Sequence, residues 1–438
     1  MKMKLKQLCR PATIIFCITL VGCSSGNTTN TNTSPIVPIL DQHAFNFIFV
    51  PSFESSPTTN NLSIQGLNHS LLFGQMLNNI TANQVAAIYA LDPFATIVDN
   101  LSDLKPLQSI ENYALLNGSG VNDILPSDPS TIENIILDVL QNSSYGVITS
   151  GNYVFAMPTT LINTVLSDLS AYNNYALSFT FEPITNNHQY LILSISDMAN
   201  MAANTYTDGI NASTTYPNVR VASNSRCLES TVTISTSGNN PANITRNETV
   251  YFVRHVEAHP AENAGGSFDN GNYVCQGQWR ALASPAILFD KMGSKLPDYI
   301  YSSDPSDFYW ESLPTYIRPA LTITPFAIKY NMPLNLIESS MFSWDQPESL
   351  ASYLFTGNKF NNRTVLVAWE HGNIKAAIHF LLQNIYNDPN AANQLPHWSD
   401  TDYDTLWKVE IDQNGTATFS NSCEGIDSAS LPMACPKL

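Results

Sequence analysis

Basic residues are scarce in this sequence. Its 438 residues include only 19 lysines and arginines against 36 aspartates and glutamates, which gives a formal net charge of −17. Nucleic-acid binding depends largely on cations that neutralise backbone phosphates, so we expect no nucleic-acid partner. Charged residues of both signs make up 13% of the chain, whereas apolar residues make up 44%. That balance predicts a globular protein with ample material for a buried core.

The N-terminal segment has no apolar run long enough to cross a membrane. The basic residues 1–10 precede an apolar run of about ten residues, whereas a spanning helix needs about 20. We therefore interpret residues 1–22 as a secretory signal peptide. The letters LVGC ending at Cys23 resemble a bacterial lipobox, which implies lipidation at Cys23 and a flexible tether over residues 23–40. Ser24 resembles the outer-membrane sorting pattern, so we expect a cell-envelope protein facing the periplasm or the exterior.

Zinc-binding patterns are also missing from the sequence. It contains no CxxC pair and no closely spaced histidines, so we predict neither a metal site nor a cofactor. An exported protein meets an oxidising environment, where one or two disulfides are expected. Unpaired thiols are the alternative, and three pairings are possible among the four cysteines beyond the anchor: Cys227, Cys275, Cys423 and Cys435.

Strand-like and helix-like segments alternate in two successive stretches of the chain. The first stretch runs from about residue 45 to 198, and the second from about residue 250 to the end. Such alternation predicts α/β domains with a mostly parallel sheet. We expect one domain over residues 41–200, a linker over 201–225 rich in Asn, Thr and Gly, and a second domain over 226–438.

The two stretches share letters at matching places, which predicts an internal repeat. Each stretch ends in an expected β-hairpin, and the matching strings come in the same order. Any two α/β domains share some strand and helix patterns, and that is the alternative explanation. The strings are FIFVPSFES and VYFVRHVEA, IYALDP and IYSSDP, KPLQSIENYAL and RPALTITPFAI, and VITSGNY and AWEHGNI.

The pair Arg254-His255 directly follows the apolar strand VYFV. A strand ending there places both side chains at the carboxyl edge of a sheet, where open α/β folds bind ligands. The string RHVE resembles the RHG(E/Q) signature of the histidine phosphatase, or phosphoglycerate mutase-like, superfamily. Val256 stands where that signature usually has glycine.

Three further segments resemble that superfamily in the order it requires. YSSDP is similar to its YSSPL element, and RPALTITPFAI is similar to its arginine helix with Arg318 in the arginine position. The insertion SDFYWESLPTYI separates these two segments. WEHGNI places His371 where the family has its second histidine. The resemblance spans residues 250–385 and implies two phosphoglycerate mutase-like, three-layer α/β/α domains.

The resemblance also implies a role for each residue. His255 would be the nucleophile that forms a phosphohistidine without a metal, so one difficult step becomes two easier ones. Arg254, Arg318 and His371 would bind and stabilise the phosphoryl oxygens, helped by backbone N–H groups where a helix begins near Gly372. The proton for the leaving group would come from a carboxyl group. Glu338 is the best placed candidate, and its rivals are Asp304, Asp345 and Glu370.

The first stretch lacks these groups, which implies a degenerate copy that packs against the second domain or binds an unknown protein partner. At the positions that match Arg254, His255, Arg318 and His371, the first stretch has, in the same order, Pro51, Ser52, Lys105 and Ser150.

The expected function is therefore an envelope-anchored phosphatase acting on a small phosphorylated substrate, either a phosphomonoester or a phosphoanhydride. A phosphomutase would use the same intermediate. The alternative from another class is a non-catalytic lipoprotein that uses both domains as a binding or structural scaffold.

Overall fold

The computed structural model describes residues 38–144, 150–171, 177–197, 200–223, 227, 230–238, 240–258, 270–309 and 314–437. The expected signal peptide, Cys23 and nearly all of the expected tether lie outside these ranges. None of the described helices is both long and apolar enough to span a membrane. Residues 35–438 belong to one compact unit, which contains both α/β halves.

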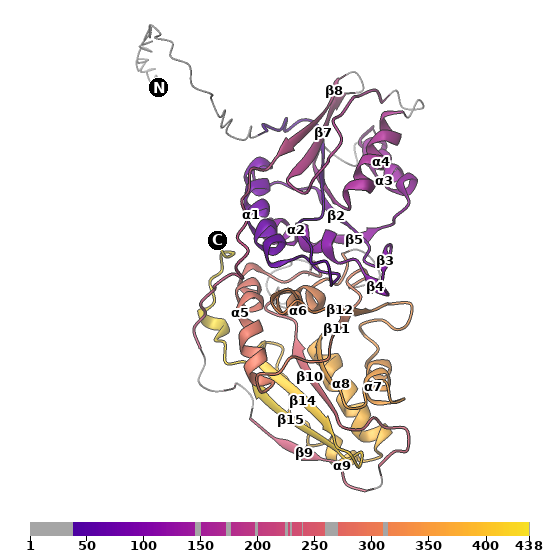
Figure 1. Ribbon diagram of the computed structural model, residues 1–438, viewed down its shortest axis with the longest axis vertical. Helices are drawn as coiled ribbons and strands as arrows, with labels where there is room; N and C mark the ends of the chain where they lie inside the picture. Colours follow the sequence, from indigo (N-terminus) through magenta and orange to yellow (C-terminus); the bar gives the residue numbers. More distant parts are fainter. Residues whose placement is uncertain are drawn as a thin grey trace, which may run out of the picture. The chain divides into compact units, whose positions relative to one another are not determined.

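The first half contains one large sheet and a small two-stranded one (Figure 1). The large sheet has the strand order β5-β2-β6-β1-β7-β8, in which only the β7 and β8 pairings are antiparallel. The elements, in chain order, are β1 Phe45–Val50, α1 Ile64–Ile80, β2 Ala87–Leu91, β3 Ile97–Val98, β4 Leu101–Ser102, α2 Lys105–Leu116, β5 Asn122–Leu125, α3 Pro129–Ser144, β6 Gly151–Ala156, α4 Thr159–Ser170, β7 Gln189–Asp197 and β8 Asn200–Thr207.

The second half has a sheet of order β12-β11-β13-β10-β14-β15-β9. Its elements, in chain order, are β9 Thr233–Ser235, β10 Glu248–Arg254, α5 Cys275–Lys291, β11 Tyr299–Ser303, α6 Arg318–Lys329, β12 Leu334–Ile337, α7 Pro347–Phe355, β13 Thr364–Trp369, α8 His371–Phe380, the π-helical turn Leu381–Ile385, α9 Pro389–Ala392, β14 Thr405–Ile411, β15 Ala417–Cys423 and the 3₁₀ turn Ser428–Ser430.

The two halves share one topology. Apart from the additional edge strand β9, the strand orders coincide position by position, and equivalent neighbours run in the same relative direction. The hairpin β14–β15 lies where the sequence predicts one. The expected α/β fold class is confirmed, but the sheets are mixed: the second one has as many antiparallel pairings as parallel ones.

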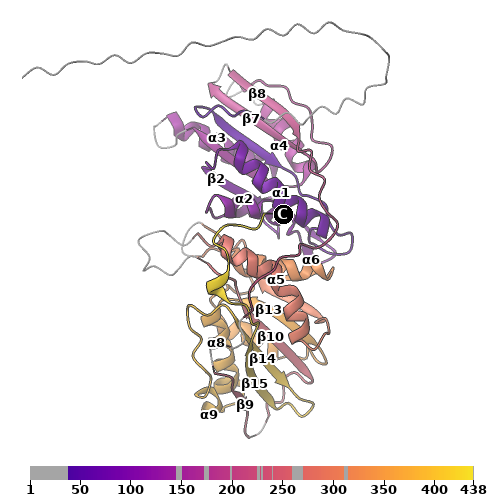
Figure 2. The ribbon, with the colours of Figure 1, turned by 90° about the vertical axis from the view of Figure 1, so that its left-hand side faces the viewer.

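Helices cover both faces of each sheet, which gives three layers (Figures 1 and 2). Successive strand side chains point to opposite faces. In β1, accordingly, Ile48 and Val50 pack with α1 and α2, whereas Phe47 and Phe49 pack with α3 and α4. In the second half, α5 and α6 cover one face, and α7 and α8 cover the other.

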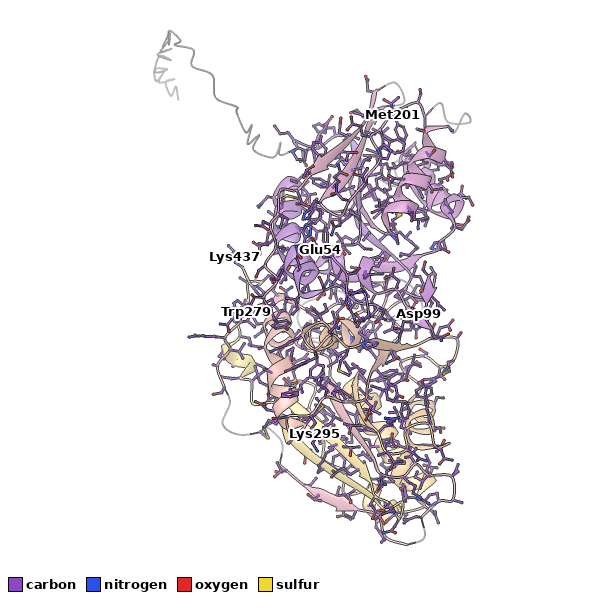
Figure 3. The ribbon with its side chains drawn as sticks, viewed as in Figure 1. Glu54, Asp99, Met201, Trp279, Lys295 and Lys437 are labelled. Atoms are coloured by element: carbon purple, nitrogen blue, oxygen red, sulfur yellow. A yellow bond between two sulfur atoms is a disulfide. The ribbon has the colours of Figure 1, made fainter. Side chains whose placement is uncertain are left out.

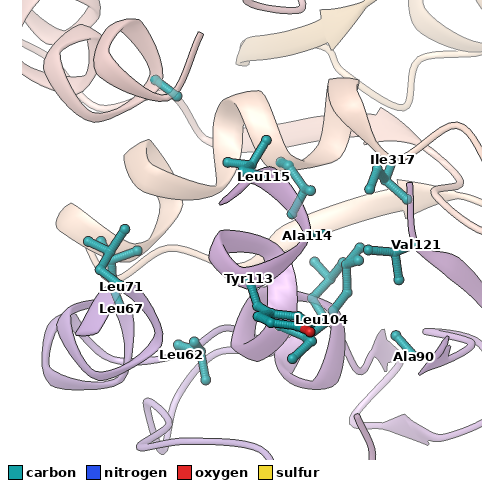
Figure 4. Close-up of a cluster of buried hydrophobic side chains, with 14 of the residues drawn as sticks. Leu62, Leu67, Leu71, Ala90, Leu104, Tyr113, Ala114, Leu115, Val121 and Ile317 are labelled. Atoms are coloured by element: carbon teal, nitrogen blue, oxygen red, sulfur yellow. The ribbon is translucent and has the colours of Figure 1, made fainter. Parts of the chain in front are cut away.

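One hydrophobic core continues from the first half into the second. It joins the α1/α2 layer to the α5/α6 layer, and Figure 4 shows Leu115 and Val121 of the first half in the same cluster as Ile317 of the second. Polar contacts cross the same boundary. The side-chain amide of Asn60 donates to the carbonyl oxygens of Ser102 and Leu334, each at 2.8 Å. The first half therefore packs against the second, one of the two roles that we expected for it.

Four cysteines form two disulfides, Cys227–Cys423 and Cys275–Cys435. The sequence left three pairings open, and the structure selects one of them. The first disulfide fastens the segment before β9 to the end of β15. The second fastens the start of α5 to the C-terminal segment, so both lie in the half that carries the histidine motif.

Two boundaries differ from the sequence prediction. The linker expected over residues 201–225 begins inside β8, which pairs with β7 along most of its length. β8 is an edge strand of mostly polar residues, none of which is fully buried. Its sequence therefore lacks the apolar pattern by which a strand is predicted. The first-half hairpin is consequently β7–β8, and it begins later than the string ALSFTFEPITNNHQYLILSI indicates.

The match between Ser150 and His371 is wrong. His371 is the first residue of α8, directly after β13, whereas Ser150 precedes β6, the strand equivalent to β13. Thr159, the first residue of α4, occupies the position equivalent to His371. The shared Gly-Asn letters misled the alignment because they occur at opposite ends of equivalent strands. The first half still lacks a histidine at this position.

Candidate active site

The predicted site residues come from three adjacent places at the carboxyl edge of the second sheet. β10 ends at Arg254, which is paired with Trp369, the last residue of the neighbouring parallel strand β13. His371 begins α8 two residues later, and Arg318 begins α6. The carboxyl ends of parallel strands meet at one edge of a sheet, so the fold brings these segments together.

His255 is a buried neutral imidazole. The residue is only 4% exposed, and its Nδ1 atom is 2.9 Å from the carbonyl oxygen of Val256. A carbonyl oxygen only accepts, so Nδ1 carries the hydrogen and Nε2 keeps its lone pair. Burial lowers the pKa of His255 well below its usual value, and the positive charges of Arg318 and Arg254 lower this pKa further. Nε2 is therefore suited to act as a nucleophile.

Arg254 is held by the segment Ser399–Tyr403, which precedes β14. One terminal nitrogen, Nη1, donates to the carbonyl oxygens of Ser399 (3.2 Å), Asp400 (2.7 Å) and Asp402 (3.0 Å). The guanidinium carbon also lies 4.0 Å from the ring centroid of Tyr403, a cation–π distance. These contacts fix the direction of the guanidinium beside His255.

Arg318 and His255 share Tyr316 as a neighbour. The guanidinium carbon of Arg318 lies 5.0 Å from the ring centroid of Tyr316, and the His255 ring centroid lies 6.3 Å from the same point. Arg318 also lies over the ring of Tyr309, at 4.6 Å. Both the arginine and Tyr316 are buried, so aromatic rings shield the charge from solvent.

His371 lies between two carboxylates. Nε2 is 2.9 Å from an oxygen of Asp400, and Nδ1 is 2.5 Å from an oxygen of Glu370. The Asp400 side chain is 82% exposed, whereas Glu370 is largely shielded. The Nε2 side of His371 therefore faces the exposed carboxylate of Asp400, and the Nδ1 side faces the shielded carboxylate of Glu370.

Glu370 caps helix α8. Its carboxylate accepts the backbone N–H groups of Gly372 (2.9 Å) and Asn373 (2.7 Å). Burial raises the pKa of Glu370, but the hydrogen bond and charge of His371 and these two N–H groups outweigh it and lower the pKa to about 2. Contrary to our expectation, the N–H groups near Gly372 are not available to a phosphoryl group. The lowered pKa of Glu370 also disfavours it as the proton donor.

Shared neighbours show that the two imidazoles and two guanidiniums converge. Asp400 contacts Arg254 through its carbonyl oxygen and His371 through its carboxylate. Tyr316 contacts both His255 and Arg318. The charge of His371 also contributes to the lowered pKa of His255. The structure therefore gathers all four predicted side chains in one region.

The predicted proton donor stands apart from this group. Glu338 is exposed, directly after β12, and among the described residues no hydrogen bond or ion pair joins it to the four. Its rival Asp304 is buried after β11 and accepts the backbone N–H groups of Ser306 (2.9 Å) and Ser339 (3.0 Å). Asp345, the third rival, is exposed.

Sequence reasoning missed the segment Ser399–Tyr403 and Tyr316. The string SDTDY carries two acids and an aromatic residue immediately before an expected hairpin, a signal that could have drawn attention to it. Tyr316 falls within the insertion that the superfamily resemblance could not interpret.

Glu257, the last letter of RHVE, belongs to a buried ionic cluster rather than to the reacting group. Arg280 of α5 donates through Nε to both oxygens of Glu257, at 2.9 and 3.1 Å. Its Nη1 donates to Asp404 (3.2 Å) and Glu424 (3.1 Å). We call these four residues the Arg280 cluster. The cluster joins the turn after His255 to the residue after Tyr403, so it supports both sides of the candidate site.

We expect Asp400→Asn to strengthen inhibition by inorganic phosphate. The Asp400 carboxylate pairs with His371 and adds negative charge near Arg254, so it would compete with an anion bound by these two side chains. Neutralising an exposed charge is worth up to about 1 kcal/mol, so the inhibition constant should fall about threefold to fivefold. Asp298→Asn, which alters an exposed acid paired with Arg363, is the matched control. An unchanged or raised constant for Asp400→Asn would show that this carboxylate does not face the anion.

No protein-family model and no curated protein matches the sequence. Among solved structures, the chain is similar to phosphoglycerate mutase from Plasmodium falciparum, with 14% identity, a TM-score of 0.27, and coverage of 44% of this chain and 99% of the mutase. It is similar to the protein histidine phosphatase SixA complexed with tungstate, with 14% identity, a TM-score of 0.27, and coverage of 40% and 97%. It is also similar to alpha-ribazole phosphatase from Shigella flexneri, with 11% identity, a TM-score of 0.27, and coverage of 41% and 98%.

Proposed function

We propose that this protein is a histidine phosphatase that hydrolyses a phosphomonoester or phosphoanhydride through a phosphohistidine at His255. The observation that carries the proposal is the buried imidazole of His255, whose pKa is lowered and which lies in the same region as Arg254, Arg318 and His371. Nε2 attacks phosphorus, the bond to the leaving oxygen breaks, and water then attacks the phosphohistidine to release phosphate and regenerate the imidazole.

The cations stabilise the charge that develops on the phosphoryl oxygens. Both guanidiniums and the His371 imidazole surround His255 in a region largely shielded from water, where such interactions are strongest. The Val256 carbonyl keeps the hydrogen on Nδ1 and thereby directs Nε2 toward the substrate. For the proton of the leaving alcohol we keep Glu338 as the proposed donor, with Asp304 and Asp345 as its rivals.

We further propose that the first half is a degenerate copy of the second and that Cys23 carries a lipid anchor in the bacterial envelope. The shared topology of the two halves supports the first statement. The second rests on the lipobox-like letters before Cys23.

Trapping with an alkaline, denaturing quench tests the proposed intermediate. With p-nitrophenyl phosphate, a rapid release of p-nitrophenol should accompany a protein-bound phosphate that is labile in acid and stable in base. Peptide mapping should place that phosphate on His255. In Glu338→Gln, labelling by p-nitrophenyl phosphate should persist, because its leaving group needs no proton, whereas labelling by an alkyl phosphate should be lost.

The outcome also separates the alternatives. Turnover with no labelled histidine would refute the mechanism, and neither turnover nor label with a range of phosphoesters would favour a non-catalytic scaffold. A label that passes to an added alcohol rather than to water would indicate a phosphomutase.

A further inference from the structure

A second cluster of titratable side chains lies in the first half, on α1 and the turns around it. His69 Nδ1 is 2.9 Å from Glu54 Oε2, and His69 Nε2 is 3.0 Å from Asp208 Oδ2. His188 Nε2 is 3.4 Å from Glu54 Oε1, and His188 Nδ1 is 3.4 Å from Asp208 Oδ1. We call these four residues the His69 cluster; Glu54 is labelled in Figure 3. The candidate active site uses none of them.

The His69 cluster occupies the place of the Arg280 cluster in the repeated topology. Helices α1 and α5 both approach the preceding turn too closely for a side chain, because a Cβ at Gly66 would lie 2.0 Å from the Glu54 carbonyl oxygen, and one at Gly277 would lie 2.5 Å from that of Glu257. His69 and Arg280 each follow that glycine by three residues. The other equivalent pairs are His188 and Asp404, directly before β7 and β14, and Asp208 and Glu424, directly after β8 and β15.

The second half fills this place with a cation of its own, the guanidinium of Arg280, surrounded by three carboxylates. The first half has a shorter imidazole instead of the arginine and a second imidazole instead of one carboxylate. Two carboxylates remain, and the two imidazole rings are stacked with centroids 4.8 Å apart. Two stacked imidazolium ions would repel each other, so protonating both rings is a poor way to balance the two carboxylates.

Three side chains in this cluster hold potential ligand atoms close to one another. One atom each from Glu54, His69 and His188 lies within 4.8 Å of the other two. Zn²⁺ takes imidazole nitrogen and carboxylate oxygen, and sites with three protein ligands leave a fourth position open. His69 is fully buried, whereas His188 has a side chain that is 37% exposed and provides a way in from solvent.

Asp208 supports such a site from behind. Its carboxylate lies beside His69 Nε2 and His188 Nδ1 and can accept an N–H group from each. The other nitrogen of each ring, His69 Nδ1 and His188 Nε2, then faces Glu54. Asp208 is itself fixed by the backbone N–H of Ile210, at 2.7 Å. A carboxylate that orients a metal-binding imidazole in this way is a regular feature of metal sites.

We propose that Glu54, His69 and His188 bind a divalent transition-metal ion, with Zn²⁺ as the reference ion and Asp208 as the orienting carboxylate. The ion would balance both carboxylates while both imidazoles stay neutral. It would fasten the turn after β1 to α1 and to the β7–β8 hairpin, the role that Arg280 has in the second half. The ion would therefore stabilise the first half and take no part in the reaction at His255.

Zinc titration of the chelator-treated, dialysed protein tests the proposal. Calorimetry should show one tight site per chain, and ZnCl₂ should raise the midpoint of thermal unfolding. His188→Ala removes one ligand at a partly exposed position, so the variant should fold, with an unchanged far-UV circular dichroism spectrum. It should bind Zn²⁺ at least about 100-fold more weakly. Co²⁺ should give the visible absorption of a low-symmetry site in the parent protein and not in the variant.

Two controls locate the ion. His43→Ala changes an exposed histidine of the same half and should bind Zn²⁺ like the parent. His371→Ala should also keep the tight site. Loss of binding in His371→Ala, undiminished binding in His188→Ala, or no saturable binding in the parent would each overturn the proposal. None of these outcomes depends on phosphatase activity, so the metal site and the proposed function stand or fall separately.

Discussion

His255→Ala should lower kcat/KM for p-nitrophenyl phosphate by about a thousandfold or more. Removing the nucleophile leaves only positioning and charge stabilisation by Arg254, Arg318 and His371, and in other enzymes of covalent mechanism such a loss costs several orders of magnitude. The imidazole is buried, and its one side-chain hydrogen bond among the described residues is to a backbone carbonyl, so its truncation leaves no charge there without a partner. Initial rates on purified protein, together with the unfolding midpoint, check both statements.

Ser52→Ala is the matched control for this prediction. Ser52 follows β1 where His255 follows β10, and in the first half no imidazole stands at that position. We expect turnover within about twofold of the parent protein, as for most substitutions away from the reacting groups. A His255→Ala variant that retains a tenth of the parent activity would refute the nucleophile assignment. A large loss in Ser52→Ala would show that the first half contributes to catalysis.

Chelation separates the nucleophile from the proposed metal site. Imidazole attack uses the side chain of His255 itself, so initial rates should persist in EDTA at temperatures where the protein stays folded. Removal of an ion from the His69 cluster should appear instead as a lower unfolding midpoint. If the rate of the folded protein fell with the chelator and returned with Zn²⁺, the ion would be part of the reaction, and the mechanism proposed for His255 would be incomplete.

The sequence predicts that the candidate site residues come together because its signals are local. Arg254 and His255 end one strand, and His371 follows the neighbouring strand, so the rule that carboxyl ends of parallel strands meet is enough to bring them together. The capping of α8 by Glu370 was not foreseen. A carboxylate immediately before a helix start is a known cap, and that pattern in WEHGN could have indicated it.

Features assembled from distant segments are not predictable in the same way. The Ser399–Tyr403 segment reaches Arg254 only because the β14–β15 hairpin folds back onto β10. The His69 cluster joins residues from helix α1 and three separate turns, so no short spacing indicates it, and the sequence predicted no metal site. The match of Ser150 with His371 was wrong for a related reason. It relied on the shared Gly-Asn letters, whereas the ends of the equivalent strands β6 and β13 are known only from the structure.

Arg280→Met should destabilise the protein by about 3–5 kcal/mol at neutral pH, because it leaves three buried carboxylates without their cation. Burial raises the pKa of Glu424 to about 7 even though Arg280 lowers it, so its charged form is already costly. A carboxyl group whose pKa is raised by folding stabilises the folded state below its unfolded pKa, and this stability is lost as the pH rises through the folded pKa. Without the guanidinium this folded pKa should rise further.

The defect of Arg280→Met should therefore grow with pH. At pH 5 the buried carboxyl groups can take up protons, whereas at pH 8 each must remain charged or be neutralised at a cost. We expect the unfolding midpoint of the variant to fall below that of the parent by roughly 5–15 °C at pH 8 and by clearly less at pH 5. Calorimetric scans at the two pH values measure the difference.

Arg363→Met is the matched control, because Arg363 pairs with Asp298 at 3.0 Å but has a side chain that is 48% exposed. Such an exposed pair contributes about 0–1 kcal/mol, so the control should show a small loss that varies little between pH 5 and pH 8. If both variants unfolded alike at pH 8, the carboxylates of the Arg280 cluster would have to be solvated or protonated in the folded protein. The comparison between a guanidinium in the second half and a metal ion in the first would then lose its electrostatic basis, since neither half would need a cation at that position.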